Sequence, residues 1–136
     1  MKPMPAKFVD TNIIIYSLGK DEYKRGIALS ILAGSPIMSV QVLSETANIM
    51  RRKLSFEANA VISVVNKLSQ VCCQLQPLTL GTLHGGLDLA KRYGFSHYDS
   101  LIVAAALQAD CTVLYSEDMQ HSQIIDDHLT IINPFL

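Results

Sequence analysis

Four acidic residues stand at points of the chain where a folded domain could bring them together. Each lies beside apolar, structured sequence instead of in a charged surface run, and the four are Asp10, Glu45, Asp99 and Asp118. Carboxylates that converge repel one another, by roughly 3 kcal/mol for two charges about 5 Å apart at an effective dielectric constant of about 20. Some of them must then bind a proton or share a cation. A set of oxygen ligands favours the hard ions Mg2+ or Mn2+.

The elements that would position these acids alternate between short β-branched runs and longer helical segments. This alternation is typical of a mostly parallel sheet with helical crossovers. Strands are predicted over residues 7–9, 37–39, 72–75, 112–115 and 129–132, and helices over residues 21–33, 40–53, 56–70, 79–93 and 96–109. No linker or repeat interrupts the 136 residues, which predicts one α/β domain. Because ligands of such sheets bind beyond the carboxyl ends of the strands, we expect the site there.

Three of the acids also have a plain structural interpretation. Asp10 follows the first predicted strand and could simply cap the helical turn that starts at residue 11. Asp118 follows the strand that ends at residue 115 and could belong to a turn. Asp99 stands three residues after Ser96, which is capping-box spacing. Asp99 also shares a helical face with three apolar residues, where a carboxylate is costly unless it is paired or bound to metal.

Glu45 belongs to a polar stripe on the helix predicted over residues 40–53. The members of the stripe recur at spacings of four, three and four residues, and they are Gln41, Glu45, Asn48 and Arg52. A solvated helix face explains this stripe equally well. Since the stripe begins close to the end of the second predicted strand, we expect Glu45 to overhang the same edge of the sheet as Asp10.

The composition excludes several classes of protein. A formal net charge of -1 excludes a protein that holds nucleic acid on a broadly basic surface. Hydrophobic residues make up 49% of the chain, which favours an oligomer or a partner surface. Three cysteines, two of them adjacent, suit neither a disulfide framework nor a zinc site. The chain shows no signal-peptide pattern and no apolar run of about 20 residues, so we expect a cytoplasmic protein without a membrane segment.

Segments spread over the chain together resemble the PIN-domain ribonucleases, and most closely the VapC-type toxins of bacterial toxin–antitoxin modules. These segments are FVDTNIIIY at residues 8–16, Glu45, YDSLIVAAA at residues 98–106 and LYSEDM at residues 114–119. The resemblance covers essentially the whole chain. It implies a single domain over residues 1–136, with a five-stranded parallel sheet flanked by helices in a three-layer, Rossmann-like sandwich.

The same resemblance implies an acidic pocket that holds one or two Mg2+ or Mn2+ ions and cleaves RNA, commonly tRNA or mRNA. The catalytic and metal-binding residues would be Asp10, Glu45, Asp99 and Asp118. Supporting hydrogen bonds would come from Thr11 or Asn12, and from Ser116. Proteins of this type usually form homodimers and are inhibited by an antitoxin, whose tail lies across the helical pair at residues 40–70 and the pocket.

Two basic clusters are the groups best able to guide an RNA backbone toward a negatively charged pocket. They consist of Arg51, Arg52 and Lys53, and of Lys91 and Arg92. Ordinary solvated helix ends would explain them equally well.

Two other functions stay open. One is a non-catalytic module of the same fold that binds RNA or protein. The other is an aspartyl phosphotransferase in which Asp10 becomes phosphorylated. Such sites need an acid two residues later or an acidic pair just before the aspartate, and here Asn12 and Val9 occupy these positions.

Overall fold

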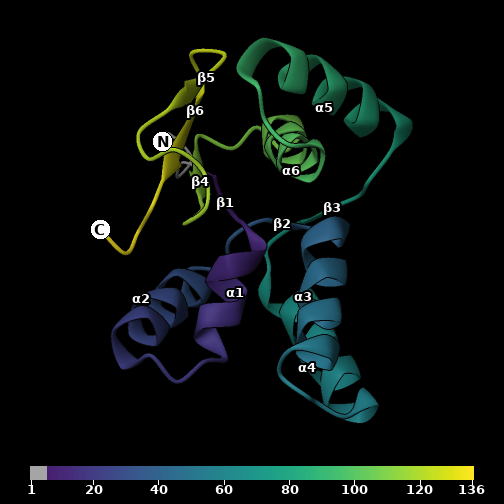
Figure 1. Cartoon of the computed structure of the whole chain (residues 1–136), viewed down its shortest axis with the longest axis vertical. Helices are drawn as coiled ribbons and strands as arrows, with labels where there is room; N and C mark the ends of the chain where they lie inside the picture. Colours follow the sequence, from purple (N-terminus) through teal and green to yellow (C-terminus); the bar gives the residue numbers. More distant parts are fainter. Residues whose placement is uncertain (1–5) are drawn as a thin grey trace.

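The computed structural model describes residues 6–136 and shows helices arranged around two small sheets (Figure 1). Its helices are α1 (Thr11–Ser17), α2 (Glu22–Ala33), α3 (Val40–Arg52), α4 (Ala58–Val71), α5 (Leu80–Tyr93) and α6 (His97–Gln108). Its strands are β1 (Lys7–Val9), β2 (Met38–Ser39), β3 (Leu75–Gln76), β4 (Val113–Tyr115), β5 (Ile124–Ile125) and β6 (Leu129–Ile132). The expected α/β class is confirmed.

The larger sheet has four strands in the order β1-β4-β6-β5. Strands β1, β4 and β6 are parallel, whereas β5 runs antiparallel to β6. Strands β2 and β3 form a separate parallel pair, and a single bridge from Phe8 to Ile37 places β2 beside β1. The expectation of one five-stranded parallel sheet is therefore wrong. Strands β2 and β3 are too short to join the larger sheet by a full ladder, and β5 adds an antiparallel edge.

Local sequence signals placed several elements correctly. The strands over residues 7–9 and 129–132 have the predicted bounds, and the helix after Asp21 ends at Ala33 as predicted. Its cap is also observed, since the Lys24 backbone N–H donates to Asp21 Oδ1 over 3.1 Å. The strand predicted over residues 72–75 begins later, at Leu75, because Cys72 still caps α4.

The helices pack in pairs around the sheets. Figure 1 shows the α1–α2 pair and the α3–α4 pair extending from the same end of the strands, with α5 and α6 packed together beside the larger sheet. The core contains side chains from strands and helices alike, among them Phe8, Ile13, Ile102, Leu114 and Ile131, each no more than 1% exposed. Within residues 6–136, no helix combines the length and apolar character needed to cross a bilayer.

The packing of α5 against α6 gives a stability prediction. A Cβ atom at Gly86 would lie 2.9 Å from Leu101 Cδ2 and 3.3 Å from Ser100 Oγ, and both neighbours are buried. We expect Gly86→Ala to lower the free energy of unfolding by about 1 kcal/mol, because overpacking outweighs the gain in helix propensity. Gly26 in α2 has no atom within 4 Å of such a Cβ. As the matched control, Gly26→Ala should raise the free energy of unfolding by about 0.5–1 kcal/mol in the same urea titration.

Candidate active site

Asp10 lies at the junction of β1 and α1 and is only 5% exposed. Its Oδ1 accepts a hydrogen bond of 2.7 Å from the Thr11 backbone N–H, so the expected N-cap is present. Its Oδ2 accepts a second hydrogen bond of 2.8 Å from Ser116 Oγ, which follows β4. This second bond joins the ends of two neighbouring parallel strands. Asp10 therefore serves as a cap and is also part of a polar cluster between strands.

Asn12 connects Asp10 to the loop that follows β4. Its Nδ2 donates to Asp118 Oδ2 over 3.1 Å and approaches Asp10 Oδ2 at 3.5 Å. Its Oδ1 accepts from the Glu117 backbone N–H over 3.1 Å. Asn12 thus orients the exposed carboxylate of Asp118 and the backbone beside it.

Glu45 and Asp99 approach the same region from two helices. Glu45 on α3 is half-buried, and its Oε2 accepts a long hydrogen bond of 3.5 Å from Thr11 Oγ1. Asp99 lies half-buried in the first turn of α6, where its backbone N–H donates to Ser96 Oγ over 3.3 Å. The expected cap at Ser96 is therefore observed. Residues Ser100 to Ala106 are all buried, so α6 has no single core-facing side and its periodicity does not place Asp99 toward the core.

The four acids differ in exposure and act on one another through their charges. Burial raises the pKa of Asp10 to about 6, two hydrogen bonds oppose this shift, and the charges of Asp99 and Glu45 add to it. Burial also raises the pKa of Asp99, the Ser96 hydroxyl opposes this, and the charge of Asp118 adds to it. These charge effects connect Asp10 to Asp99 and Glu45, and Asp99 to Asp118.

The donor chemistry of this group suits a hard divalent cation that keeps part of its water shell. Among residues 6–136, none of the four carboxylates forms an ion pair with a basic side chain. In the same part of the chain, no three His, Cys, Asp or Glu side chains are close enough to form a complete metal cluster. Mg2+ commonly contacts one or two carboxylates and retains several waters, so it does not need such a cluster. The all-carboxylate donor set and its uncompensated charge fit Mg2+ or Mn2+.

A fifth acid, Glu117, lies between two site residues in sequence but is held by other groups. Its carboxylate forms an ion pair of 2.6 Å with Lys24 of α2 and accepts a hydrogen bond from the Tyr16 hydroxyl of α1. Partial burial would raise the pKa of Glu117, but these two hydrogen bonds outweigh it and lower the pKa. The pair fastens the loop at residues 116–118 to α1 and α2. No spacing in the sequence indicates this contact, because Lys24 and Glu117 are 93 residues apart.

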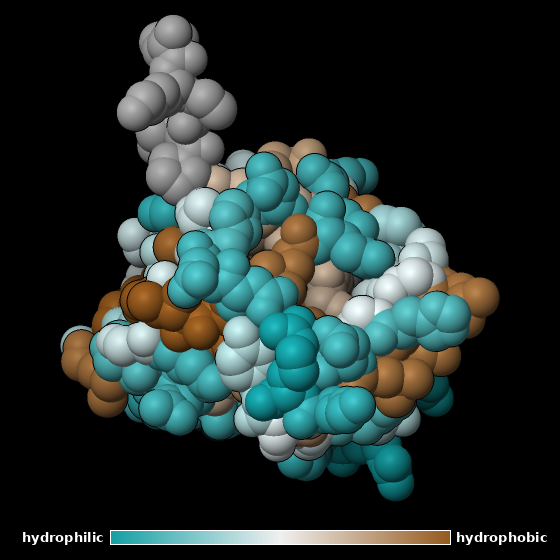
Figure 2. All heavy atoms as spheres, turned by 90° about the horizontal axis from the view of Figure 1, so that it is seen from above, coloured by the Kyte–Doolittle hydropathy of each residue, from teal (hydrophilic) through white to brown (hydrophobic). Residues whose placement is uncertain are grey.

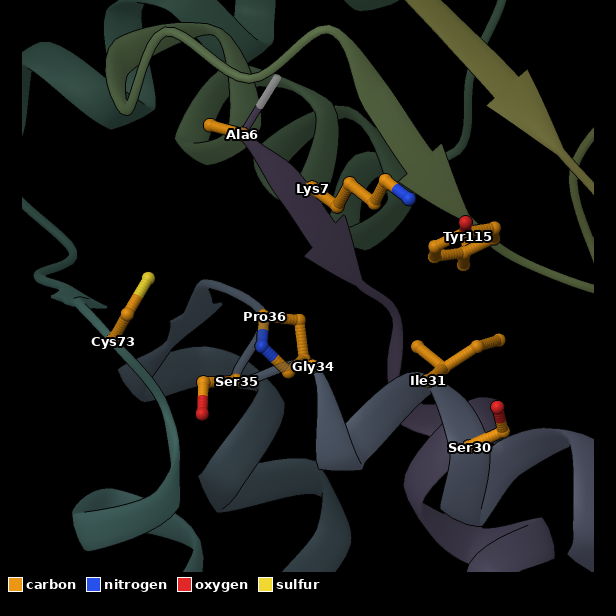
Figure 3. A pocket seen from close by; sticks show the side chains of 9 residues that line it. All are labelled: Ala6, Lys7, Ser30, Ile31, Gly34, Ser35, Pro36, Cys73 and Tyr115. Carbon is orange, nitrogen blue, oxygen red and sulfur yellow. The ribbon is translucent and has the colours of Figure 1, made fainter. Parts of the chain in front are cut away.

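A sizeable cavity lies apart from the four acids. It has a volume of about 570 Å3 and is lined by residues that include Lys7, Ile31, Pro36, Cys73 and Tyr115 (Figure 3). None of the four acids lines it. This cavity is therefore separate from the candidate active site.

The predicted basic residues differ in their distance from the acids and in their ion pairs. Arg51, Arg52 and Lys53 lie at the end of α3, roughly 9–12 Å beyond Glu45 along the helix axis at about 1.5 Å per residue. Arg92 is engaged in ion pairs of 2.8 Å with Asp88 and 2.6 Å with Asp126. A role of these residues, and of Lys91, in guiding RNA stays a prediction.

Comparison with known proteins identifies the fold. A family model described as PIN domain matches residues 7–126, and no curated protein matches the chain. The structure is similar to Mycobacterium tuberculosis VapC20, a sarcin-ricin loop cleaving toxin, with 21% identity, a TM-score of 0.68, and coverage of 83% of this chain and 90% of that one. It is similar to a toxin–antitoxin complex from Klebsiella pneumoniae, with 16% identity, a TM-score of 0.72, and coverage of 95% and 98%. The structure is also similar to a DNA-bound VapBC from Salmonella typhimurium, with 17% identity and a TM-score of 0.67. The match covers 94% of this chain and 97% of that one.

These identities are low, so the solved structures support a likeness of fold. The family model spans most of the sequence and includes all four acids. The resemblance inferred from the sequence segments is thereby confirmed, and the chain belongs to the PIN domain family.

Proposed function

We propose that this chain is a Mg2+- or Mn2+-dependent endoribonuclease that acts as a toxin and is inhibited by a cognate antitoxin. The observation that carries the proposal is the buried carboxylate of Asp10, whose pKa is raised by burial and by the charges of two further acids. A buried carboxylate whose charge is opposed by two further acids, and which has no basic partner among residues 6–136, is costly to ionise unless a cation joins it. On a PIN fold, such an arrangement is best explained as a catalytic metal site.

The side chains at this site would have different roles. Asp10, Glu45, Asp99 and Asp118 would hold the cation. When bound, the cation would supply a water of lowered pKa and positive charge beside the scissile phosphate. Ser116 and the Thr11 backbone N–H keep both oxygens of Asp10 oriented. No protein nucleophile is needed.

Two observations bear on the other functions. The separation of the carboxylates, which leaves no complete cluster among residues 6–136, would also suit a non-catalytic module that binds RNA or protein. Asp10 is 5% exposed and both of its oxygens accept hydrogen bonds, which disfavours attack by Asp10 on a phosphoryl donor.

We propose that the antitoxin, which is expected to lie across the helical pair at residues 40–70 and the pocket, also contacts an apolar groove between α2 and α4. This groove has a volume of about 350 Å3, and Leu29, Leu32, Val64 and Leu68 contribute to its lining. Solved structures of similar fold include toxin–antitoxin complexes, which supports a protein partner of this kind. An amphipathic helix would place its apolar side in such a groove.

We also propose that the chain forms a homodimer. Large apolar side chains are exposed on and before α5, including Leu78 at 52%, Leu80 at 67% and Leu87 at 52%. On the face drawn in Figure 2, apolar residues form several separate patches between polar ones. Sedimentation of the purified chain, alone and with its antitoxin, would measure both associations.

The central experiment is a cleavage assay with purified protein and total RNA, followed by sequencing of the new RNA ends. We expect cleavage at defined positions with Mg2+ or Mn2+ and none in excess EDTA, because the acidic site requires a cation. Cleavage that persists in EDTA would refute metal dependence. An absence of cleavage with every RNA and both metals would favour the non-catalytic module.

A further inference from the structure

Gln41 connects two of the helices that carry candidate metal ligands. It lies in the first turn of α3, is 8% exposed, and precedes Glu45 by one helical turn. Its Nε2 donates one hydrogen bond of 2.7 Å to Glu45 Oε1 and another of 3.1 Å to the Tyr98 backbone carbonyl. Tyr98 immediately precedes Asp99 in α6. One amide group therefore joins the Glu45 carboxylate to the backbone beside Asp99.

The orientation of this amide is determined by its surroundings. Both neighbours of Nε2 are acceptors, namely a carboxylate and a carbonyl. If the amide were rotated by half a turn, its oxygen would face these two acceptors and both hydrogen bonds would be lost. Gln41 therefore has its nitrogen toward the site.

The other end of the same amide has no counterpart. Gln41 Oε1 is buried and accepts no hydrogen bond from any residue between 6 and 136. A buried acceptor without a partner destabilises a fold, whereas an apolar side chain of similar shape would avoid this cost. The two hydrogen bonds that Nε2 donates offset this cost, and the shorter of them is made to a candidate metal ligand.

Gln41 also donates the shortest hydrogen bond to the Glu45 carboxylate among residues 6–136. The other hydrogen bond to this carboxylate, from Thr11 Oγ1, is 3.5 Å long and at the limit of a useful interaction. Without Gln41, the Glu45 side chain would keep only this weak restraint among the contacts of residues 6–136.

We propose that Gln41 is a positioning residue that holds the Glu45 carboxylate in place for a divalent cation. This inference depends on the proposed metal site and adds to it a residue that contacts neither the cation nor the RNA. A purely structural clamp between α3 and α6 is the competing explanation. The two differ in their effect on Mn2+ affinity, because loss of a purely structural clamp would leave the affinity of the folded protein unchanged, whereas loss of a positioning residue would weaken it.

The test compares Gln41→Met with Gln108→Met. Methionine keeps the length of glutamine but has no amide. Gln108 Oε1 accepts a hydrogen bond of 2.7 Å from Thr82 between α5 and α6, which makes it a matched contact between helices that involves none of the four acids. For each variant, the thermal midpoint is measured in EDTA, Mn2+ affinity by calorimetry and RNA cleavage by rate.

For Gln41→Met we expect Mn2+ affinity that is weaker by about tenfold, in the range typical for partners of metal ligands. The midpoint should fall at most modestly, because two hydrogen bonds are lost while one unpartnered oxygen is removed. For Gln108→Met we expect unchanged Mn2+ affinity and no rise in the midpoint. A Gln41→Met protein that is unfolded, or that has a lower midpoint with wild-type Mn2+ affinity, would establish the structural clamp instead.

The same measurements separate this inference from the proposed function. If the wild type binds Mn2+ and cleaves RNA while Gln41→Met binds Mn2+ equally well, only the inference about Gln41 fails. If the wild type binds Mn2+ but cleaves no RNA, the nuclease proposal fails, and weaker Mn2+ binding by Gln41→Met still supports the positioning role. If the wild type binds no Mn2+, both are refuted.

Discussion

Replacement of Asp10 by asparagine is expected to lower the rate of metal-dependent RNA cleavage by at least about a hundredfold, because loss of even an indirect partner of a metal ligand costs about 10- to 100-fold. The fold should survive, since an asparagine oxygen can still accept from the Thr11 backbone N–H and its amide can donate to Ser116 Oγ. The measurements are single-turnover cleavage with Mn2+ and the thermal midpoint of the same preparation.

Asp127→Asn is the matched control for this substitution. Asp127 is exposed in the turn between β5 and β6, where its φ of 52° suits asparagine as well as aspartate. Its replacement also removes one negative charge but should leave the cleavage rate unchanged. Equal activity of Asp10→Asn and Asp127→Asn would show that the carboxylate of Asp10 takes no part in the reaction.

Asp10 should also make the free energy of unfolding depend on pH in a way that the asparagine variant does not share. Burial, together with the charges of Asp99 and Glu45, raises the pKa of Asp10 from 3.8 to about 6. Between these values the folded chain keeps a proton that the unfolded chain releases, so stability falls as the pH rises through this window. Above it, the ionised carboxylate costs the fold about 3 kcal/mol, at about 1.4 kcal/mol per pKa unit.

Urea titrations of the wild type and Asp10→Asn in EDTA, at pH 4 and at pH 7, measure this effect. The variant should gain up to about 3 kcal/mol relative to the wild type between the two pH values, because other groups titrate alike in both chains. Added Mn2+ at pH 7 should then raise the stability of the wild type more than that of the variant. If the difference in the free energy of unfolding between the two chains stayed constant across this pH range, burial would not raise the pKa of Asp10.

The sequence predicted the local features of this fold well, for identifiable reasons. Caps at Asp10, Asp21 and Ser96 depend on a side chain and a backbone N–H that are at most three residues apart, so each is visible in a short segment. The antiparallel strand β5 was not predicted. It consists of two residues before a turn in which Asp126 and Asp127 both have positive φ, and two residues are too few to show an alternating pattern.

By itself, the sequence determined which residue types can bind a cation and the order of most elements. Several spaced segments also indicated the family to which the chain belongs. Only the tertiary structure decided how the side chains meet. It showed that Asn12 joins Asp118 to the end of β1, that Gln41 joins α3 to α6, and that Lys24 binds Glu117. These contacts connect residues that are 106, 57 and 93 positions apart. Helical and strand periodicities specify which face a residue occupies within its own element, but the direction of contact between elements depends on how those elements pack.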